Sequence, residues 1–99
     1  MNGEPLVQKV VITNPQGFHM RPMAAFAQLA SHFESSVKVC REGQSVNGKS
    51  ILDLMLLAAA QGSELTLEVA GSDAQAALDA LVQLLKMPTE DEPPQPTVA

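Results

Sequence analysis

The spacing of apolar and polar positions changes several times along the chain, and each change predicts a new secondary-structure element. Short β-branched stretches, and stretches in which apolar and polar residues alternate, predict strands. Stretches in which apolar residues recur at spacings of three and four predict helices. The predicted strands are residues 6–13, 35–42, 45–47 and 63–71, and the predicted helices are residues 19–33, 49–62 and 72–86.

Turn and cap residues stand at the boundaries of these elements. The sequences NPQG and EGQS, which begin at Asn14 and Glu42, are typical of turns. Gly62 is expected to end the second helix, because glycine is favoured just past a last helical turn. Ser72, with Gln75 three residues later, fits a capping box that opens the last helix. The first helix is expected to place on one apolar face the residues Phe26, Leu29, Ala30 and Phe33.

The order of these elements, β-α-β-β-α-β-α, predicts the fold class. Four short strands with helices between them are not enough for a doubly wound parallel sheet. A mostly antiparallel sheet with its helices packed on one face buries the apolar positions of both. We therefore predict an α+β fold, a two-layer open-faced β-sandwich with a four-stranded, mostly antiparallel sheet and three helices on one face.

Composition narrows the classes of protein that the chain can be. Its 99 residues suffice for one domain, and 45% hydrophobic residues with three Phe and no Trp or Tyr predict an aliphatic core. A net charge of -5 argues against non-specific binding to nucleic acid or to an anionic membrane. Cys40 is the only cysteine, which excludes an intramolecular disulfide and a cysteine-based zinc site. Without a signal peptide or a long apolar segment, the expected location is the cytoplasm, with no membrane insertion.

The end of the chain differs from the rest in composition. Residues 87–99, MPTEDEPPQPTVA, contain four prolines and three adjacent acids, which predicts a disordered acidic tail after a domain at residues 1–86. Six basic and eight acidic residues remain without this tail, so that the domain carries a charge near -2. The tail is either a passive solubilising end or an interaction segment.

Residues 43–50, GQSVNGKS, match the phosphate-binding loop pattern G-x-x-x-x-G-K-[ST]. Such a loop needs a parallel strand before it and an Asp on a second strand to hold Mg²⁺. The expected hairpin instead places Gly43 in a turn, and Asp73 is better explained as a first-turn acid of the last helix. A nucleotide-binding site is therefore not favoured. Ser50 with Asp53 three residues on predicts an N-cap for the second helix.

The sequence GFHMRP at residues 17–22 carries candidate chemistry. Pro22 is tolerated only in the first turn of a helix, which places His19 at or near the N-cap. The positive end of a helix favours the neutral, nucleophilic imidazole, and the free N–H groups of Met20 and Arg21, with the Arg21 guanidinium, could hold phosphoryl oxygens. This pattern predicts phosphoryl transfer without hydrolysis. The alternative is a histidine that only caps the helix.

GFHMRP, together with VNGKSILDLMLLAAAQGSELTLEVAG, resembles HPr, the bacterial histidine-containing phosphocarrier family of the phosphoenolpyruvate-dependent phosphotransferase system. The resemblance covers about residues 6–86. It implies a carrier that is not an enzyme, with no cofactor and no metal. His19 would accept a phosphoryl group from Enzyme I on its δ nitrogen and pass it to enzyme IIA proteins of the sugar-uptake or the nitrogen-type branch, and Arg21 would stabilise that group.

The resemblance also implies a regulatory site and a docking surface on a monomer. Ser50 matches the serine that HPr kinase/phosphorylase modifies, and an alternative function is a mainly regulatory interaction protein controlled there. Met20, Met23 and Asp53 depart from the usual family residues, and His32 is expected to be a solvated or capping residue. The residues implied in partner docking are Phe18, Met20, Lys49, Ile51, Leu52 and Met55. Some of the apolar ones must also serve the core face of the second helix.

Overall fold

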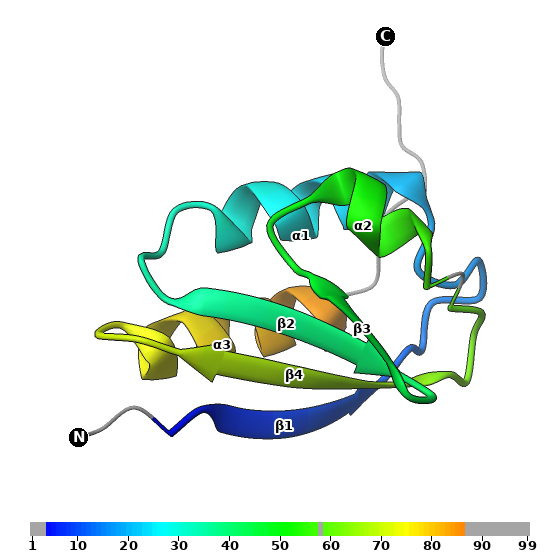
Figure 1. Ribbon diagram of the computed structural model, residues 1–99. Coiled ribbons are helices and arrows are strands. Elements are labelled where there is room, and N and C mark those ends of the chain that lie inside the picture. Colours follow the sequence, from blue (N-terminus) through cyan, green and yellow to red (C-terminus); the bar gives the residue numbers. More distant parts are fainter. Residues whose placement is uncertain (1–3, 58, 87–99) are drawn as a thin grey trace, which may run out of the picture.

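The computed structural model describes residues 4–57 and 59–86 (Figure 1). Within these ranges the order β1-α1-β2-β3-α2-β4-α3 confirms the predicted order. The tail predicted at residues 87–99 lies outside the described residues. The elements are β1 Leu6–Val11, α1 Met20–Ala30, β2 Ser36–Arg41, β3 Gln44–Asn47, α2 Ile51–Met55, β4 Glu64–Ala70 and α3 Ala74–Lys86.

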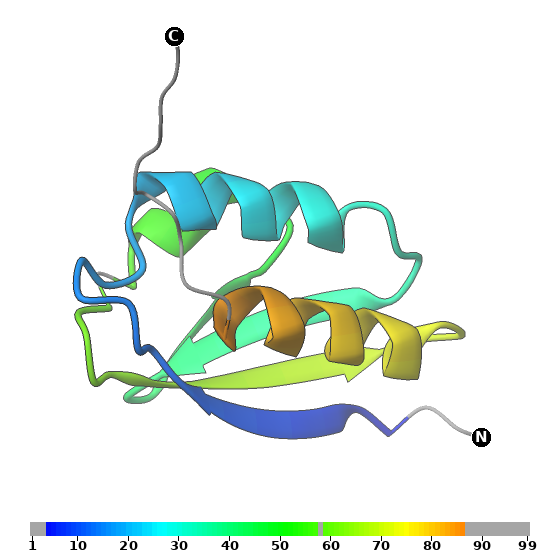
Figure 2. The same ribbon diagram turned by 180° about the vertical axis from the view of Figure 1, so that it is seen from behind.

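The four strands form one sheet in the order β1-β4-β2-β3, and every pairing in it is antiparallel. In both views the helices lie together on one face of this sheet, and the other face carries none of them (Figures 1 and 2). The predicted two-layer α+β fold is therefore confirmed. None of the helices in the described ranges is long and apolar enough to cross a membrane.

Alternation along the central strand β4 sets the two faces of the sheet. Leu65, Leu67 and Val69 are 0% exposed and face the helices, while the residues between them are only partly covered. The rings of Phe18 and Phe26 meet edge to face, with centroids 5.9 Å apart. The remaining core is aliphatic, as the composition predicts.

Helix α1 ends three residues before Phe33. Phe26 and Ala30 are buried and Leu29 is half-buried, so the predicted apolar face is present. Ser31 is the C-cap, and its hydroxyl donates to the Ala27 carbonyl at 2.8 Å. Phe33 lies in the turn beyond the helix and packs against the core from there.

Helix α2 is much shorter than predicted, because its C-terminal sequence has tertiary partners. The last turn already uses i to i+3 hydrogen bonds, from Leu56 N to Asp53 O and from Leu57 N to Leu54 O. Farther on, the Ala59 carbonyl accepts from Phe18 N at 2.8 Å, and Gly62 N donates to the Ile12 carbonyl at 2.8 Å. Gly62 lies in a turn before β4 and does not end the helix.

The β2–β3 hairpin explains why the phosphate-loop pattern is accidental. Arg41 pairs with Gln44, so the loop has two residues, Glu42 and Gly43, with φ of 50° and 86°. Two positive φ values are those of a type I′ turn. The first glycine of the pattern thus lies in a hairpin turn, and an antiparallel edge strand separates it from Ser50.

The carboxylate of Asp73 joins two loops instead of serving the first turn of α3. It accepts from Glu34 N at 3.0 Å, from Ser35 N at 2.9 Å and from the Ser35 hydroxyl. The predicted capping box is wrong, because α3 begins at Ala74 and both box partners point elsewhere. Ser72 Oγ donates to Glu34, and Gln75 Nε2 donates to Asp79.

These hydrogen bonds make part of the stability depend on pH. The Ser35 hydroxyl, followed by the Glu34 amide, lowers the pKa of the Asp73 carboxyl below its usual value. A lowered pKa in the folded state stabilises the fold above the ordinary aspartate pKa of about 3.9, and this contribution is lost as the pH falls through the lowered value.

We expect Asp73→Asn to lower the melting temperature at pH 7 and to differ less from the wild type at pH 3. Asp79→Asn is the matched control, because Asp79 accepts one bond from Gln75 on the exposed face of the same helix. Thermal unfolding followed by circular dichroism at both pH values measures the difference. An Asp73→Asn deficit that is equal at pH 7 and pH 3 would contradict the assignment.

Candidate functional site

His19 is the N-cap of α1, as predicted. Its backbone is extended, with φ of -96° and ψ of -170°, and its carbonyl accepts the first helical hydrogen bond from Met23 N at 2.9 Å. Its Nδ1 accepts from Arg21 N at 3.4 Å. The sequence predicts a free N–H at Arg21, but in the structure this N–H donates to the imidazole ring itself.

This hydrogen bond assigns different roles to the two ring nitrogens of His19. An acceptor nitrogen carries the lone pair, so Nδ1 is unprotonated in the neutral ring and the proton is on Nε2. The Nε2 atom is buried and has no hydrogen-bond partner within the described part of the chain. The nucleophilic lone pair is therefore at Nδ1, at the N-terminus of α1.

The backbone immediately before His19 packs against the segment that follows α2. Gly17 has φ of +75°, and a Cβ atom there would lie 2.7 Å from the Ala59 carbonyl oxygen. Phe18 N donates to that same oxygen, and the Phe18 ring is only 3% exposed. The prediction that Phe18 contributes to a docking surface is wrong for its side chain, because the ring belongs to the core.

An open hollow of about 640 Å³ adjoins the imidazole and is lined by Gln16, His19, Met20, Arg21 and Ala24. Arg21 is exposed, so its guanidinium is free to turn toward a ligand on His19. Gln16 was not among the residues predicted from the sequence. Its position in the turn before the glycine is the signal that could have identified it.

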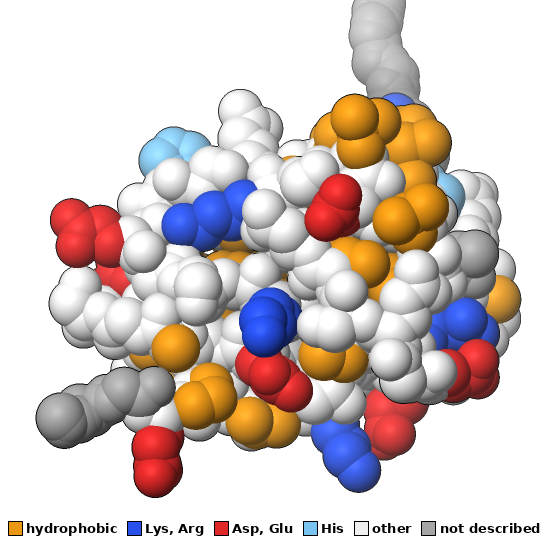
Figure 3. Space-filling model, viewed as in Figure 1, with side chains coloured by type: hydrophobic (Ala, Val, Ile, Leu, Met, Phe, Trp, Pro, Cys, Tyr) orange, Lys and Arg blue, Asp and Glu red, His pale blue; other side chains and the backbone are white. Residues whose placement is uncertain are grey.

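Beside this hollow lies an apolar surface formed by exposed side chains of α1, of α2 and of the residue just after α2. Figures 1 and 2 place the start of α1 next to the end of α2, and Figure 3 shows apolar side chains gathered over both. We define the apolar surface by its exposed fractions, which are Met20 52%, Leu52 72%, Met55 44% and Leu56 62%. Four large exposed apolar residues at one end of a small protein are typical of a contact site.

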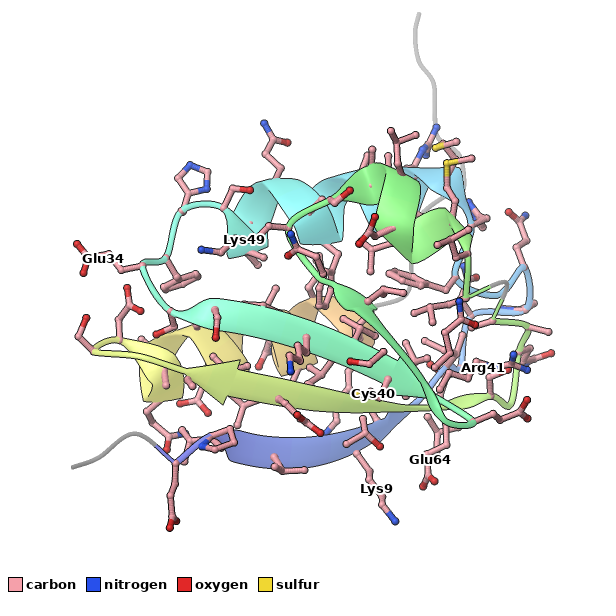
Figure 4. The ribbon with its side chains drawn as sticks, viewed as in Figure 1. Lys9, Glu34, Cys40, Arg41, Lys49 and Glu64 are labelled. Atoms are coloured by element: carbon pink, nitrogen blue, oxygen red, sulfur yellow. The ribbon has the colours of Figure 1, made fainter. Side chains whose placement is uncertain are left out.

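Two residues implied in docking contribute less to this surface than expected. Ile51 is half-buried and packs against the core. The Lys49 ammonium group donates to the Phe33 carbonyl at 2.8 Å, and its side chain points toward the end of α1 (Figure 4). Leu56 was missed, because residues 49–62 were expected to be one continuous helix and its exposure depends on where α2 ends.

Ser50 is the N-cap of α2, as predicted, and its hydroxyl accepts from Asp53 N at 3.2 Å. The second half of the capping arrangement differs, because Asp53 Oδ2 accepts from Asn47 N at 3.2 Å and not from Ser50 N. Ser50 N donates instead to the Asn47 carbonyl. The Asp53 carboxylate is thus held close to the start of the helix that Ser50 caps.

The fold and the site together are those of a small protein that presents one histidine, at the start of a helix, next to an exposed apolar surface. A family model described as "PTS HPr component phosphorylation site" matches residues 6–87. The chain therefore belongs to the HPr family, the phosphocarrier proteins of the phosphotransferase system. Members of this family are carriers and not catalysts.

Individual relatives agree with this assignment. The chain is 46% identical over 80 residues to the phosphocarrier protein HPr of Cupriavidus necator. The aligned region covers 81% of this chain and 90% of the relative. The chain is similar to the crystal structure of HPr from Bacillus anthracis, with a TM-score of 0.78, 36% identity, and coverage of 81% of this chain and 95% of that one.

Some solved relatives are dimers, so that the expected monomer is not confirmed. A crystal structure of Crh from Bacillus subtilis, described as a dimer with a swapping domain, has a TM-score of 0.67 and 42% identity, with coverage of 80% of this chain and 91% of that one. The oligomeric state of this chain therefore stays a prediction.

Proposed function

We propose that this chain is a cytoplasmic phosphocarrier that accepts a phosphoryl group from phospho-Enzyme I on Nδ1 of His19 and passes it to enzyme IIA proteins. The observation that carries the proposal is the hydrogen bond from Arg21 N to Nδ1, which leaves the lone pair on this nitrogen at an open helix N-terminus. Family membership supports the same role.

In the proposed transfer, the Nδ1 lone pair attacks phosphorus while the donor's bond to phosphorus breaks and its electron pair leaves with the donor. Nε2 keeps its proton during this step. The Arg21 N–H, released from the lone pair, can donate to a phosphoryl oxygen, and the Arg21 guanidinium adds a charge-assisted donor. The positive end of α1 favours the charge that arrives.

The lining of the hollow supports a relay in preference to hydrolysis. Its five residues, given above, include no carboxylate that could activate water. We propose that the apolar surface docks Enzyme I and enzyme IIA proteins in turn, each through a small and transient interface. The phosphoryl group would then leave His19 only when an acceptor occupies the hollow.

Intact-mass spectrometry after incubation with phosphoenolpyruvate and catalytic Enzyme I tests this function. We expect one added phosphoryl group that is lost in acid, as expected for a phosphorus–nitrogen bond. Subsequent addition of an enzyme IIA protein should remove the group from this chain and add it to the acceptor. A folded chain that takes up no phosphoryl group under these conditions would overturn the proposal.

A second candidate function is regulation through phosphorylation of Ser50 by HPr kinase/phosphorylase. Two observations support it. Ser50 comes directly before α2, which carries Leu52 and Met55 of the apolar surface. The chain is also 45% identical over 74 residues to the HPr-like protein Crh of Bacillus subtilis, and the aligned region covers 75% of this chain and 87% of the relative. A phosphate at Ser50 would change the charge at the edge of that surface.

We expect Asp53→Asn to accelerate Ser50 phosphorylation by about threefold, because the carboxylate held near Ser50 repels an incoming phosphoryl group. Phosphoryl uptake from ATP in the presence of the kinase, measured by mass spectrometry, gives the rate. Ser50→Ala is the control and should take up nothing. Equal rates for the wild type and Asp53→Asn would show that the carboxylate does not limit modification.

A further inference from the structure

The turn before His19 is closed by a single side chain, that of Asn14. Its Nδ2 donates to the Gly17 carbonyl at 3.0 Å, and its Oδ1 accepts from Gln16 N at 3.5 Å. Its main-chain carbonyl accepts from Gly17 N at 2.8 Å. Asn14 thus binds both polar backbone groups of Gly17, and the side chain is half-buried while it does so.

Gly17 transmits this arrangement to His19. It is pressed against the segment after α2, with no room for a Cβ atom beside the Ala59 carbonyl, and Phe18 N donates to the same carbonyl. Figures 1 and 2 show the loop before α1 and the segment after α2 side by side at one end of the molecule. His19 is the second residue after Gly17, so the orientation of the Gly17 peptide groups sets the direction from which the imidazole leaves the loop.

The hydrogen bond to the imidazole tolerates little displacement of the loop. The bond from Arg21 N to Nδ1 is already 3.4 Å long, near the limit for a hydrogen bond, so a small shift of the loop breaks it. Loss of this bond removes the preference for the tautomer whose lone pair is on Nδ1. Misplacement of a reacting atom by about 1 Å can reduce a rate by about 100-fold.

We propose that Asn14 is a positioning residue for the phosphoryl acceptor, acting through Gly17 on the orientation and the tautomer of His19. Asn14 has no part in the apolar surface that meets partners. The inference rests on the proposed function, because it assigns Asn14 a role in transfer to His19. It also predicts a change in the imidazole that does not depend on any partner protein.

The kinetic test compares Asn14→Ala with the wild type as acceptors from phospho-Enzyme I, at varied concentrations of the chain. We expect kcat to fall roughly tenfold, with KM changed by less than about twofold, because the docking residues are untouched. Asn14→Asp keeps an acceptor for Gln16 N but cannot donate to Gly17, and it should resemble Asn14→Ala. Gln61→Ala is the control, since it removes a side-chain bond to the neighbouring Thr13 carbonyl.

The partner-independent test is ¹⁵N NMR of the imidazole, which separates the two neutral tautomers. The wild type should carry its proton on Nε2, and Asn14→Ala should show a mixture. An unchanged kcat in Asn14→Ala, a change confined to KM, or an unchanged tautomer would each overturn the positioning role. If the wild type accepts no phosphoryl group, the proposed function fails, while the tautomer comparison still decides whether Asn14 controls His19.

Discussion

Replacing His19 with asparagine is expected to abolish phosphoryl uptake from phospho-Enzyme I and to leave the fold intact. Asparagine is among the best N-cap residues, so it can take over the bond from Arg21 N that the imidazole now accepts. The stability of the variant should therefore be within about 1 kcal/mol of the wild type. The nucleophilic nitrogen, in contrast, is lost completely.

The matched control is His32→Asn, which removes the other histidine of the chain. His32 Nδ1 contacts the Gln28 carbonyl at 2.9 Å on the exposed side of α1, far along the helix from the hollow. This variant should take up one phosphoryl group at the wild-type rate. Uptake by His19→Asn, or its loss in His32→Asn, would move the acceptor away from His19.

Replacing Phe26 with alanine is expected to destabilise the fold by about 3–5 kcal/mol. Phe26 is 0% exposed, and its ring meets Phe18 edge to face at an interplanar angle of 79°. Small domains are stabilised by only about 5–15 kcal/mol in total, so the loss is a large part of the whole. Because Phe18 directly precedes His19, the loosened core should also slow phosphoryl uptake.

Phe33→Ala is the control, because Phe33 is only half-buried and should lose less stability. Urea unfolding followed by far-ultraviolet circular dichroism is the suitable measurement, since the chain has no Trp or Tyr to report by fluorescence. Equal losses for the two variants would mean that the core around Phe26 collapses into the space left by the ring.

The apolar periodicity and the cap signals were sufficient for the order of elements and the fold class. His19 and Ser50 were placed correctly as N-caps for the same reason. Each of these features depends on residues within four positions of one another, through hydrogen bonds and side-chain contacts along one helix or one strand. Local chemistry of this kind is written directly in the sequence, so both N-caps could be located before any contact was known. The resemblance to HPr is what marked them as candidate phosphorylation sites.

Features that depend on distant partners could not be read from the sequence. Helix α2 ends at Met55, and the segment after it is bound by distant residues: Gly62 N, which a longer helix would use internally, donates to the Ile12 carbonyl, and the Ala59 carbonyl accepts from Phe18 N. The Asp73 carboxylate accepts hydrogen bonds from the amides of Glu34 and Ser35 and not from the first turn of α3, which begins at the next residue. The same long-range packing buries Phe18. It also exposes Leu56, beyond the early end of α2.

The sequence by itself thus determined the element order, the fold class and the positions of both candidate phosphorylation sites. The tertiary structure alone decided where α2 ends, which loops the Asp73 carboxylate joins, and which side chains are exposed in the apolar surface. The physical reason is that a backbone group or an apolar side chain with a local partner is predictable from its neighbours. A group that can also find a distant partner binds whichever of the local and the distant partner is more favourable. That outcome depends on the folded chain and cannot be predicted from neighbouring residues.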